Sequence, residues 1–197
     1  MFRTAPLILA LLLPACAASS YVSPVEVTRF VGEQPGQLGR GTIAVRAAPG
    51  GVDDSLEFSA YERAVAAELT ELGYNVVPVG EAAQVAELRF VRAAGPQGAS
   101  RRSPVNVGVG GSTGSFGSGL GVGLGIDLSG PPQQMIDTEI GVTIRDNGSG
   151  AALWEGRAGF SASANSEFAE RPAAAARLAD ALFDGFPGQS GETIEIR

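Results

Sequence analysis

The sequence predicts an α+β domain in which a mostly antiparallel sheet carries two helices on one face. Three observations support this. Segments with period-two alternation come in runs, two segments with helical periodicity interrupt these runs, and turn sequences join several alternating segments directly. Strands grouped in runs favour antiparallel pairing with helices segregated from them. A hydrophobic content of 44% and a charged content of 18% are sufficient for a packed core.

Two strands and a helix are expected first. Residues 25–30 and 42–46 alternate as strands do, and the glycines and prolines between them indicate a loop. Ser55 is suited to cap a helix that runs to Leu72, and Gly73 is suited to the left-handed residue that ends it. The apolar positions of this helix recur at three and four residues; they are Phe58, Tyr61, Val65, Leu69 and Leu72.

Further strands follow this helix. Residues 74–79 and 86–90 are strand candidates, and in the second of them Ala86, Leu88 and Phe90 would share one face. Residues 139–145 and 153–160 alternate on either side of a turn sequence at residues 146–150. Because this turn contains Asn-Gly, the pattern predicts a hairpin.

The C-terminal region predicts a second helix. Pro172 can occupy its first turn, and Gly185 with Pro187 would end it. Residues 192–197 alternate again and form either a short last strand or a loose tail. Trp154, the single tryptophan, is expected in the core. The apolar positions of the second helix are Ala175, Leu178, Leu182 and Phe186.

A glycine-rich tract in the middle of the chain predicts a hairpin over residues 105–128. Nine of the residues from 108 to 125 are glycine, and valines or leucines alternate with them on both sides of a turn at 111–118. The favoured interpretation is a hairpin of the same sheet, and a mobile loop is the other structural possibility. The sharper hypothesis is a surface for a partner or for self-association. Its residues would be Gly119, Gly121, Gly123 and Gly125, flanked by Arg101 and Arg102.

The composition excludes several kinds of chemistry. All 14 basic residues are arginine, so neither a histidine-based triad, nor an imidazole metal ligand, nor a lysine Schiff base can form. Gly110–Gly114 matches the sequence of the serine-nucleophile motif, but the chain has no histidine to act as its partner. No dinucleotide-binding glycine pattern can be completed. We therefore expect no catalytic residues, no metal and no cofactor. The net charge of −7 also makes nucleic acid an improbable partner.

The N-terminus resembles the leader of a bacterial lipoprotein. Arg3 precedes a short apolar run that is well below the length needed to cross a bilayer. Leu13-Pro14-Ala15-Cys16 resembles a lipobox, in which the cysteine sulfur is lipidated and the leader is cut before it. We expect residues 1–15 to be a signal peptide, 16–24 a lipidated tether, and 25–197 a single domain. Cleavage would remove Arg3 and no acid, which changes the net charge from −7 to −8.

The same lipoprotein resemblance suggests a location. An aspartate after the lipidated cysteine favours the inner membrane in such proteins, so Ala17 favours the outer membrane, with the domain facing the periplasm. The alternative is an ordinary secreted protein with a stray cysteine in its leader. Cys16 is the single cysteine, so no intrachain disulfide can form.

Several segments together resemble the bacterial lipoproteins grouped by domain of unknown function 4136. Besides the leader, these are Leu72-Gly73-Tyr74 at the end of a helix, the strand Ile140–Asp146, the hairpin return Leu153-Trp154-Glu155-Gly156, and Phe186-Pro187 after the closing helix. The resemblance covers most of the mature chain. It implies an envelope lipoprotein with an α+β sheet domain, and it supplies no catalytic residues.

The leading functional hypothesis is a non-catalytic envelope lipoprotein that binds another envelope component. The alternative is a carboxylate-based hydrolase of envelope glycans, since paired carboxylates need no histidine. Its candidates are Asp53 with Asp54, and Asp180 with Asp184, although solvated loop and helix positions explain both pairs. A third possibility is a structural coat protein with neither partner nor turnover.

Overall fold

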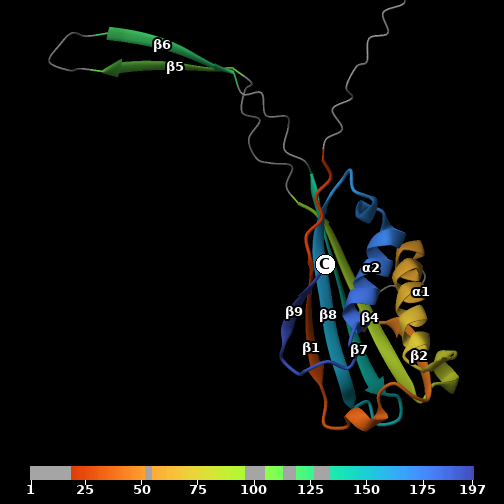
Figure 1. Ribbon diagram of the computed structural model, residues 1–197. Coiled ribbons are helices and arrows are strands. Elements are labelled where there is room, and N and C mark those ends of the chain that lie inside the picture. Colours follow the sequence, from red (N-terminus) through yellow and green to blue (C-terminus); the bar gives the residue numbers. More distant parts are fainter. Residues whose placement is uncertain (1–18, 52–54, 96–104, 113–118, 127–133) are drawn as a thin grey trace, which may run out of the picture.

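The protein is an α+β domain built on one large mixed sheet, as the sequence predicts (Figure 1). The computed structural model describes residues 19–51, 55–95, 105–112, 119–126 and 134–197. Its seven-stranded sheet has the order β3-β2-β4-β7-β8-β1-β9 and is mostly antiparallel. The strands are β1 (Val25–Val31), β2 (Thr42–Ala47), β3 (Asn75–Val76), β4 (Gln84–Ala94), β7 (Met135–Asp146), β8 (Ala152–Ser163) and β9 (Thr193–Ile196).

Two helices follow the segments predicted for them, α1 (Leu56–Glu71) and α2 (Arg171–Phe183). Ser55 caps α1, since its hydroxyl accepts a hydrogen bond of 3.0 Å from the backbone N–H of Phe58. Gly73 has φ of +100° and lets the chain turn back at the other end. Short 3₁₀ helices occur at η1 (Pro35–Gln37), η2 (Val79–Glu81) and η3 (Glu167–Ala169).

The core forms where the apolar sides of α1 and α2 meet alternate residues of the strands. Tyr61, Val65 and Leu69 of α1 are fully buried, as are Leu178 and Leu182 of α2. The helices also pack against each other. One continuous cluster therefore joins helices and sheet, as the helical spacing predicts. None of the helices in the described part of the chain is long and apolar enough to cross a membrane.

Arg29 is a charged residue at a buried position of β1, where the alternation of the strand would place an apolar residue. Its side chain is 5% exposed, while the neighbouring Phe30 is 48% exposed. The guanidinium donates from Nε to the carbonyl of Leu182 at 3.0 Å and from Nη2 to the carbonyl of Ala181 at 2.9 Å. It therefore satisfies carbonyls at the C-terminal end of α2, where a cation is favourable.

Two local predictions need correction. The strand expected over residues 74–79 shortens to β3, because Pro78 has no N–H to donate and residues 79–81 form η2 instead. The β7–β8 hairpin forms as predicted, but its turn is not closed by Asn-Gly alone. The carboxylate of Asp146 accepts hydrogen bonds from the backbone N–H groups of Gly148, at 3.1 Å, and Ser149, at 2.7 Å.

The glycine-rich tract forms the predicted pair of strands, β5 (Val105–Ser112) and β6 (Gly119–Ile126). They pair antiparallel in a two-stranded sheet of their own, whereas the sequence favoured membership of the main sheet. In five of the eight pairs, the register places an aliphatic residue opposite an aliphatic residue or a glycine opposite a glycine. Examples are Val107 with Leu124, Val109 with Val122, Gly108 with Gly123, and Gly110 with Gly121.

Candidate functional site

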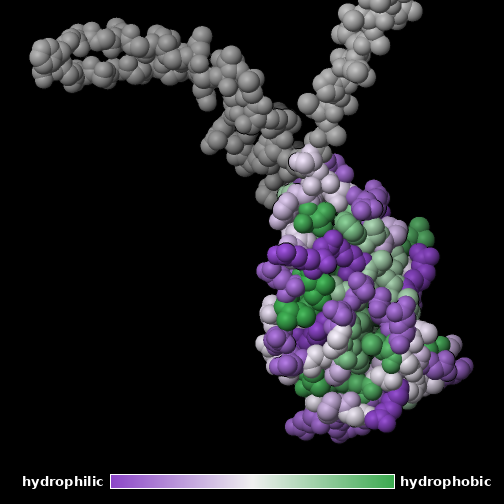
Figure 2. Space-filling view, in the orientation of Figure 1, coloured by the Kyte–Doolittle hydropathy of each residue, from purple (hydrophilic) through white to green (hydrophobic). Residues whose placement is uncertain are grey.

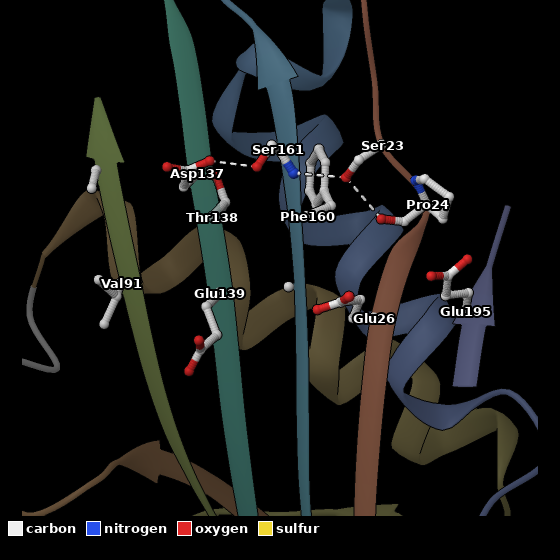
Figure 3. Close-up of a pocket in the computed structure, with 12 residues that line it drawn as sticks. Ser23, Pro24, Glu26, Val91, Asp137, Thr138, Glu139, Phe160, Ser161 and Glu195 are labelled. Carbon is white, nitrogen blue, oxygen red and sulfur yellow. Dashed lines mark hydrogen bonds between the residues drawn. The ribbon is translucent and has the colours of Figure 1, made fainter. Parts of the chain in front are cut away.

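A hollow of about 510 Å³ lies on the main sheet, across strands β4, β7, β8, β1 and β9 (Figure 3). Such a volume is within the range of small-ligand sites. We call it the acidic hollow, because four of its lining residues are carboxylates and none is basic. The lining residues are Ser23, Pro24, Glu26, Val91, Ala93, Asp137, Thr138, Glu139, Gly159, Phe160, Ser161 and Glu195.

The strand register gathers three of these carboxylates into one row. Glu139 of β7 lies opposite Gly159 of β8, which lies opposite Glu26 of β1, which lies opposite Glu195 of β9. Gly159 has no side chain, so the centre of the row is open between Glu139 and Glu26. With strands about 4.8 Å apart, the Cα atoms of those two glutamates are roughly 10 Å apart.

The row carries negative charge that no cation neutralises within the described part of the chain. Glu26, Glu139 and Glu195 form no ion pair there. Glu26 and Glu195 are direct cross-strand neighbours, an arrangement that like charges destabilise. All three side chains are exposed, so water and salt screen most of this repulsion, and a positively charged group over the row would remove the rest.

Serines and the fourth carboxylate form the rim of the hollow. Asp137 accepts a hydrogen bond from the hydroxyl of Ser161. The backbone N–H of Ser161 donates to the hydroxyl of Ser23 at 3.0 Å, and that hydroxyl donates to the carbonyl of Pro24 at 2.8 Å. Figure 3 shows these groups above the glutamate row. The rim is therefore held by its own hydrogen bonds, while the glutamates below it are not.

Arginines lie further along the same sheet, outside the hollow. Arg157 pairs with Glu155 at 2.9 Å. Glu87 accepts from both Arg46, at 2.6 Å, and Arg145, at 3.0 Å. Figure 2 shows hydrophilic and hydrophobic residues interspersed over the visible face of the domain. Arg89 of β4 lies over Gly141, two residues from Glu139, and forms no ion pair among the described residues. The lining of the hollow itself contains no basic residue.

The arrangement favours the binding of a cationic group over metal chemistry. Across the residues that the structure describes, no three His, Cys, Asp or Glu side chains are placed to hold a metal ion. Carboxylates in a concave site attract an ammonium or guanidinium group, and charge-assisted hydrogen bonds can then form. The apolar contribution of Val91, Ala93 and Pro24 adds surface for the aliphatic part of such a group.

The residues singled out from the sequence do not meet at the acidic hollow. Cys16, Arg101, Arg102 and the Asp53–Asp54 pair lie outside the described residues. Asp180 lies on α2 and Asp184 directly follows it, both exposed. Gly119, Gly121, Gly123 and Gly125 lie on β6, in the separate two-stranded sheet.

Sequence reasoning missed the acidic hollow because its carboxylates come from separate strands. Glu26 and Glu139 are the polar members of alternating segments, which a single sequence assigns to a solvated face. Only the strand order β7-β8-β1-β9 places them in one row with Glu195. The available signal was the glycine at position 159, which leaves the polar side of that strand without a side chain at one position.

Comparisons with known proteins reveal a similar fold. No protein-family model and no curated protein matches the sequence. The crystal structure of a PDZ domain protein from Parabacteroides distasonis ATCC 8503 is similar at a TM-score of 0.53 and 14% identity. The alignment covers 89% of this chain but 38% of that protein, so the likeness concerns the fold alone. The PelC dodecamer from Paraburkholderia phytofirmans aligns at a TM-score of 0.39 and 12% identity, over 79% of this chain and 91% of that one.

Proposed function

We propose that this chain is a lipid-anchored protein of the bacterial cell envelope that binds another envelope component through the acidic hollow, without catalysis. The observation that carries the proposal is the unneutralised row Glu139-Gly159-Glu26-Glu195 inside a cavity of about 510 Å³. A sheet that places like charges side by side loses stability, and proteins accept such losses mainly at functional sites.

The layer arrangement supports an accessible site. We infer that α1 and α2 lie on one face of the main sheet, because core residues of both helices form one cluster with alternate strand residues. Glu26, Gly159 and Glu139 belong to the other set of alternate residues. The acidic hollow would then lie on the face that the helices leave open.

The anchor rests on the leader and on Cys16. Lipidation of Cys16, cleavage before it, and an outer-membrane location indicated by Ala17 are all part of the proposal. The proposal also includes membership of the lipoproteins grouped by domain of unknown function 4136. Acyl chains on the new N-terminus supply durable attachment, since one chain alone binds only marginally.

The partner that fits the acidic hollow carries positive charge. Lysine or arginine side chains of an envelope protein, or amines of an envelope polymer, have this chemistry. The β5–β6 hairpin offers a second contact surface, with Arg101 and Arg102 nearby in the chain. The hairpin is a two-stranded sheet, which has two unpaired edges. Such edges can add a strand from a partner or from a second copy.

The proposal is tested by cross-linking in intact cells, followed by affinity recovery and mass spectrometry. The test variant combines Glu26→Gln, Glu139→Gln and Glu195→Gln, which removes the charge and keeps the shape. The matched control combines Glu33→Gln, Glu71→Gln and Glu81→Gln, which removes three exposed charges elsewhere. We expect the partner to fall about tenfold or more with the test variant and to stay unchanged with the control.

Two further variants separate the parts of the proposal. Gly159→Val adds bulk at the centre of the row without changing charge, and it should also reduce recovery of the partner. Cys16→Ala removes the proposed anchor and should release the protein from the membrane fraction. Full recovery of the partner by the triple glutamine variant would exclude the acidic hollow as the binding surface.

The spacing of Glu139 and Glu26 also bears on the alternative function. Their Cα atoms lie two strand spacings apart, roughly 10 Å, and the carboxyl groups of inverting glycoside hydrolases are about 6.5–9.5 Å apart. Purified protein incubated with peptidoglycan fragments would release new reducing ends if this alternative held. Loss of that activity with either Glu26→Gln or Glu139→Gln alone would establish catalysis in place of binding.

A further inference from the structure

Four buried polar atoms have no hydrogen-bond partner among the described residues. They are Tyr61 Oη, Arg92 Nη1, Thr138 Oγ1 and Arg177 Nε, from α1, β4, β7 and α2 respectively. Buried polar groups in folded proteins are nearly always hydrogen-bonded, so each such atom needs an explanation. The four residues are together called the arginine niche below.

The strand register and one ring contact place three of these residues side by side. Thr138 lies directly opposite Arg92 on β4 and directly opposite Phe160 on β8. Residues opposite one another on neighbouring strands direct their side chains to the same side. The guanidinium of Arg177 lies over the ring of Phe160, 5.3 Å from its centre. Arg92, Thr138 and Arg177 therefore lie on the same side of the sheet, with Arg92 and Phe160 on the two strands that flank Thr138 and Arg177 over Phe160.

Tyr61 completes the arginine niche from α1. Its ring stacks on that of Phe90, with centroids 4.7 Å apart, and Phe90 precedes Arg92 by two residues on the same side of β4. Burial raises the pKa of Tyr61, and the neighbouring guanidinium of Arg92 acts in the opposite direction. Arg92 acts on Tyr61 by hydrogen bonding as well as by charge, so the two groups are close, although the hydroxyl does not meet the geometry of a full hydrogen bond.

The guanidinium groups are held in place by their other atoms. Arg92 donates from Nη2 to the carbonyl of Ala169. Arg177 donates from Nη2 to the carbonyl of Ser23 at 3.1 Å, and it also lies 4.7 Å from the ring centre of Phe168. Both contacts leave other nitrogens of the two groups unused. The arginine niche is therefore pre-organised, which lowers the entropic cost of binding.

The charge of the arginine niche is unbalanced. Neither Arg92 nor Arg177 forms an ion pair with a carboxylate in the part of the chain that the structure describes. The nearby Arg171 and Glu57 pair with each other at 3.1 Å. Tyr61 and Thr138 are 0% and 2% exposed, whereas Arg92 and Arg177 are half-buried residues of which Nη1 and Nε, respectively, are buried. A ligand would therefore enter past the arginines and reach the hydroxyls behind them.

We propose that the arginine niche binds a small oxyanion, a carboxylate or phosphate group. Guanidinium groups match the planar and tetrahedral oxygens of such anions, and both hydroxyls can donate to them. Water can satisfy the hydroxyls, but it leaves two positive charges without a counter-ion. Thr138 and Phe160 border both sites, but the glutamates of the acidic hollow belong to the other set of alternate strand residues, so the arginines and the glutamates lie on opposite sides of the sheet.

The test is thermal unfolding of the full chain in sodium phosphate or sodium acetate at low millimolar concentration and constant ionic strength. Low concentrations are needed because phosphate stabilises proteins generally when concentrated. We expect the unfolding midpoint to rise with the logarithm of the concentration of at least one anion, since the ligand binds the folded state. The anion that acts at the lower concentration identifies the class of ligand.

Two variants and a control make the test specific. Tyr61→Phe and Thr138→Val each remove one hydroxyl with little change of shape, and each should weaken the apparent anion affinity about tenfold or more. Without anion both variants should unfold at or above the midpoint of the wild type, because a buried unpaired polar atom is lost. Arg157→Gln, which removes an exposed arginine elsewhere, should respond to anion as the wild type does.

Two results would overturn the proposal. One is an unfolding midpoint of the wild type that does not respond to either anion. The four atoms would then be hydrogen-bonded by water instead of by an anion. The other is a response that Tyr61→Phe and Thr138→Val leave unchanged, which would place the bound anion elsewhere. The unfolding midpoints of the two variants in anion-free buffer also show whether they are correctly folded. A misfolded variant would have a midpoint below that of the wild type.

Discussion

Gly156 shows how one residue determines packing in the β8 strand. A Cβ atom added there would lie 2.3 Å from Cη2 of Trp154 and 2.8 Å from Cδ1 of Leu182. The indole lies over the bare backbone, and its Nε1 donates to the carbonyl of Pro187 at 2.9 Å. The ring also packs at 5.5 Å from Phe183 and 5.1 Å from Phe186. This explains physically why a glycine follows Trp154 by two residues.

Gly156→Ala should therefore destabilise the protein by about 1–3 kcal/mol, because the indole must leave its place. Gly159→Ala is the matched control, since its added Cβ would meet the nearest atom at 3.6 Å, an ordinary contact. It should change stability by less than about 0.5 kcal/mol. Urea unfolding followed by the fluorescence of the single tryptophan measures both variants. Equal destabilisation by the two substitutions would contradict this account.

At the scale of elements, Glu87 joins three strands where parallel pairing meets antiparallel pairing. It lies on β4, with its parallel neighbour Arg46 on β2 and Arg145 on the antiparallel β7. Burial opposes the ionisation of Glu87, but hydrogen bonds and charge from the two arginines outweigh burial and lower its pKa. The ionised carboxylate therefore stabilises this junction.

The sign of the pH dependence follows from the lowered pKa. The contribution of Glu87 is present above the ordinary glutamate pKa of about 4.3 and is lost as the pH falls through the lower folded-state value. Glu87→Gln should cost about 1–2 kcal/mol at pH 7, a modest figure because both arginines are partly exposed. Urea unfolding should show this gap closing below about pH 4. A gap that persists at acidic pH would argue against the ion pairs, and Glu81→Gln provides an exposed control.

The elements were predictable from sequence to the extent that local patterns define them. Ser55, Gly73 and the spacing of Tyr61, Val65 and Leu69 predicted α1, because capping and amphipathicity are local properties. The parallel pairing of β2 with β4 was not predictable, because it depends on contacts between distant segments. For the same reason, neither the row of glutamates nor the arginine niche could be inferred. Both consist of side chains from separate elements that meet only in the folded chain.

At the scale of the whole molecule, the chain segments that lead to the proposed anchor and to the hairpin leave from one end of the sheet (Figure 1). The backbone N–H of Ser163 donates to Tyr21 at 2.9 Å, and that of Gly95 donates to Met135 at 2.8 Å. The rim of the acidic hollow is at this end too, at Ser23. The 12 residues of β7 extend about 36 Å from here to the opposite end.

If Cys16 is lipidated, this end of the domain faces the bilayer. The five residue-to-residue steps from Cys16 to Tyr21 span at most about 18 Å even when fully extended. The other end, near Glu81, would then be more than a strand length further away. A partner that binds in the acidic hollow would accordingly lie in the membrane or directly on it.

The prediction is tested with single-cysteine probes in the lipidated protein, where the sulfur of Cys16 is already occupied. Ala93→Cys places a fluorophore at the acidic hollow, and Glu81→Cys places it at the opposite end; both positions are exposed. In vesicles with quencher on the lipid headgroups, we expect strong quenching at position 93 and weak quenching at 81. Cys16→Ala with Ala93→Cys should show no quenching, because it lacks the anchor. Equal quenching of both anchored probes would mean that the domain lies on its side, with the acidic hollow no closer to the membrane than the rest.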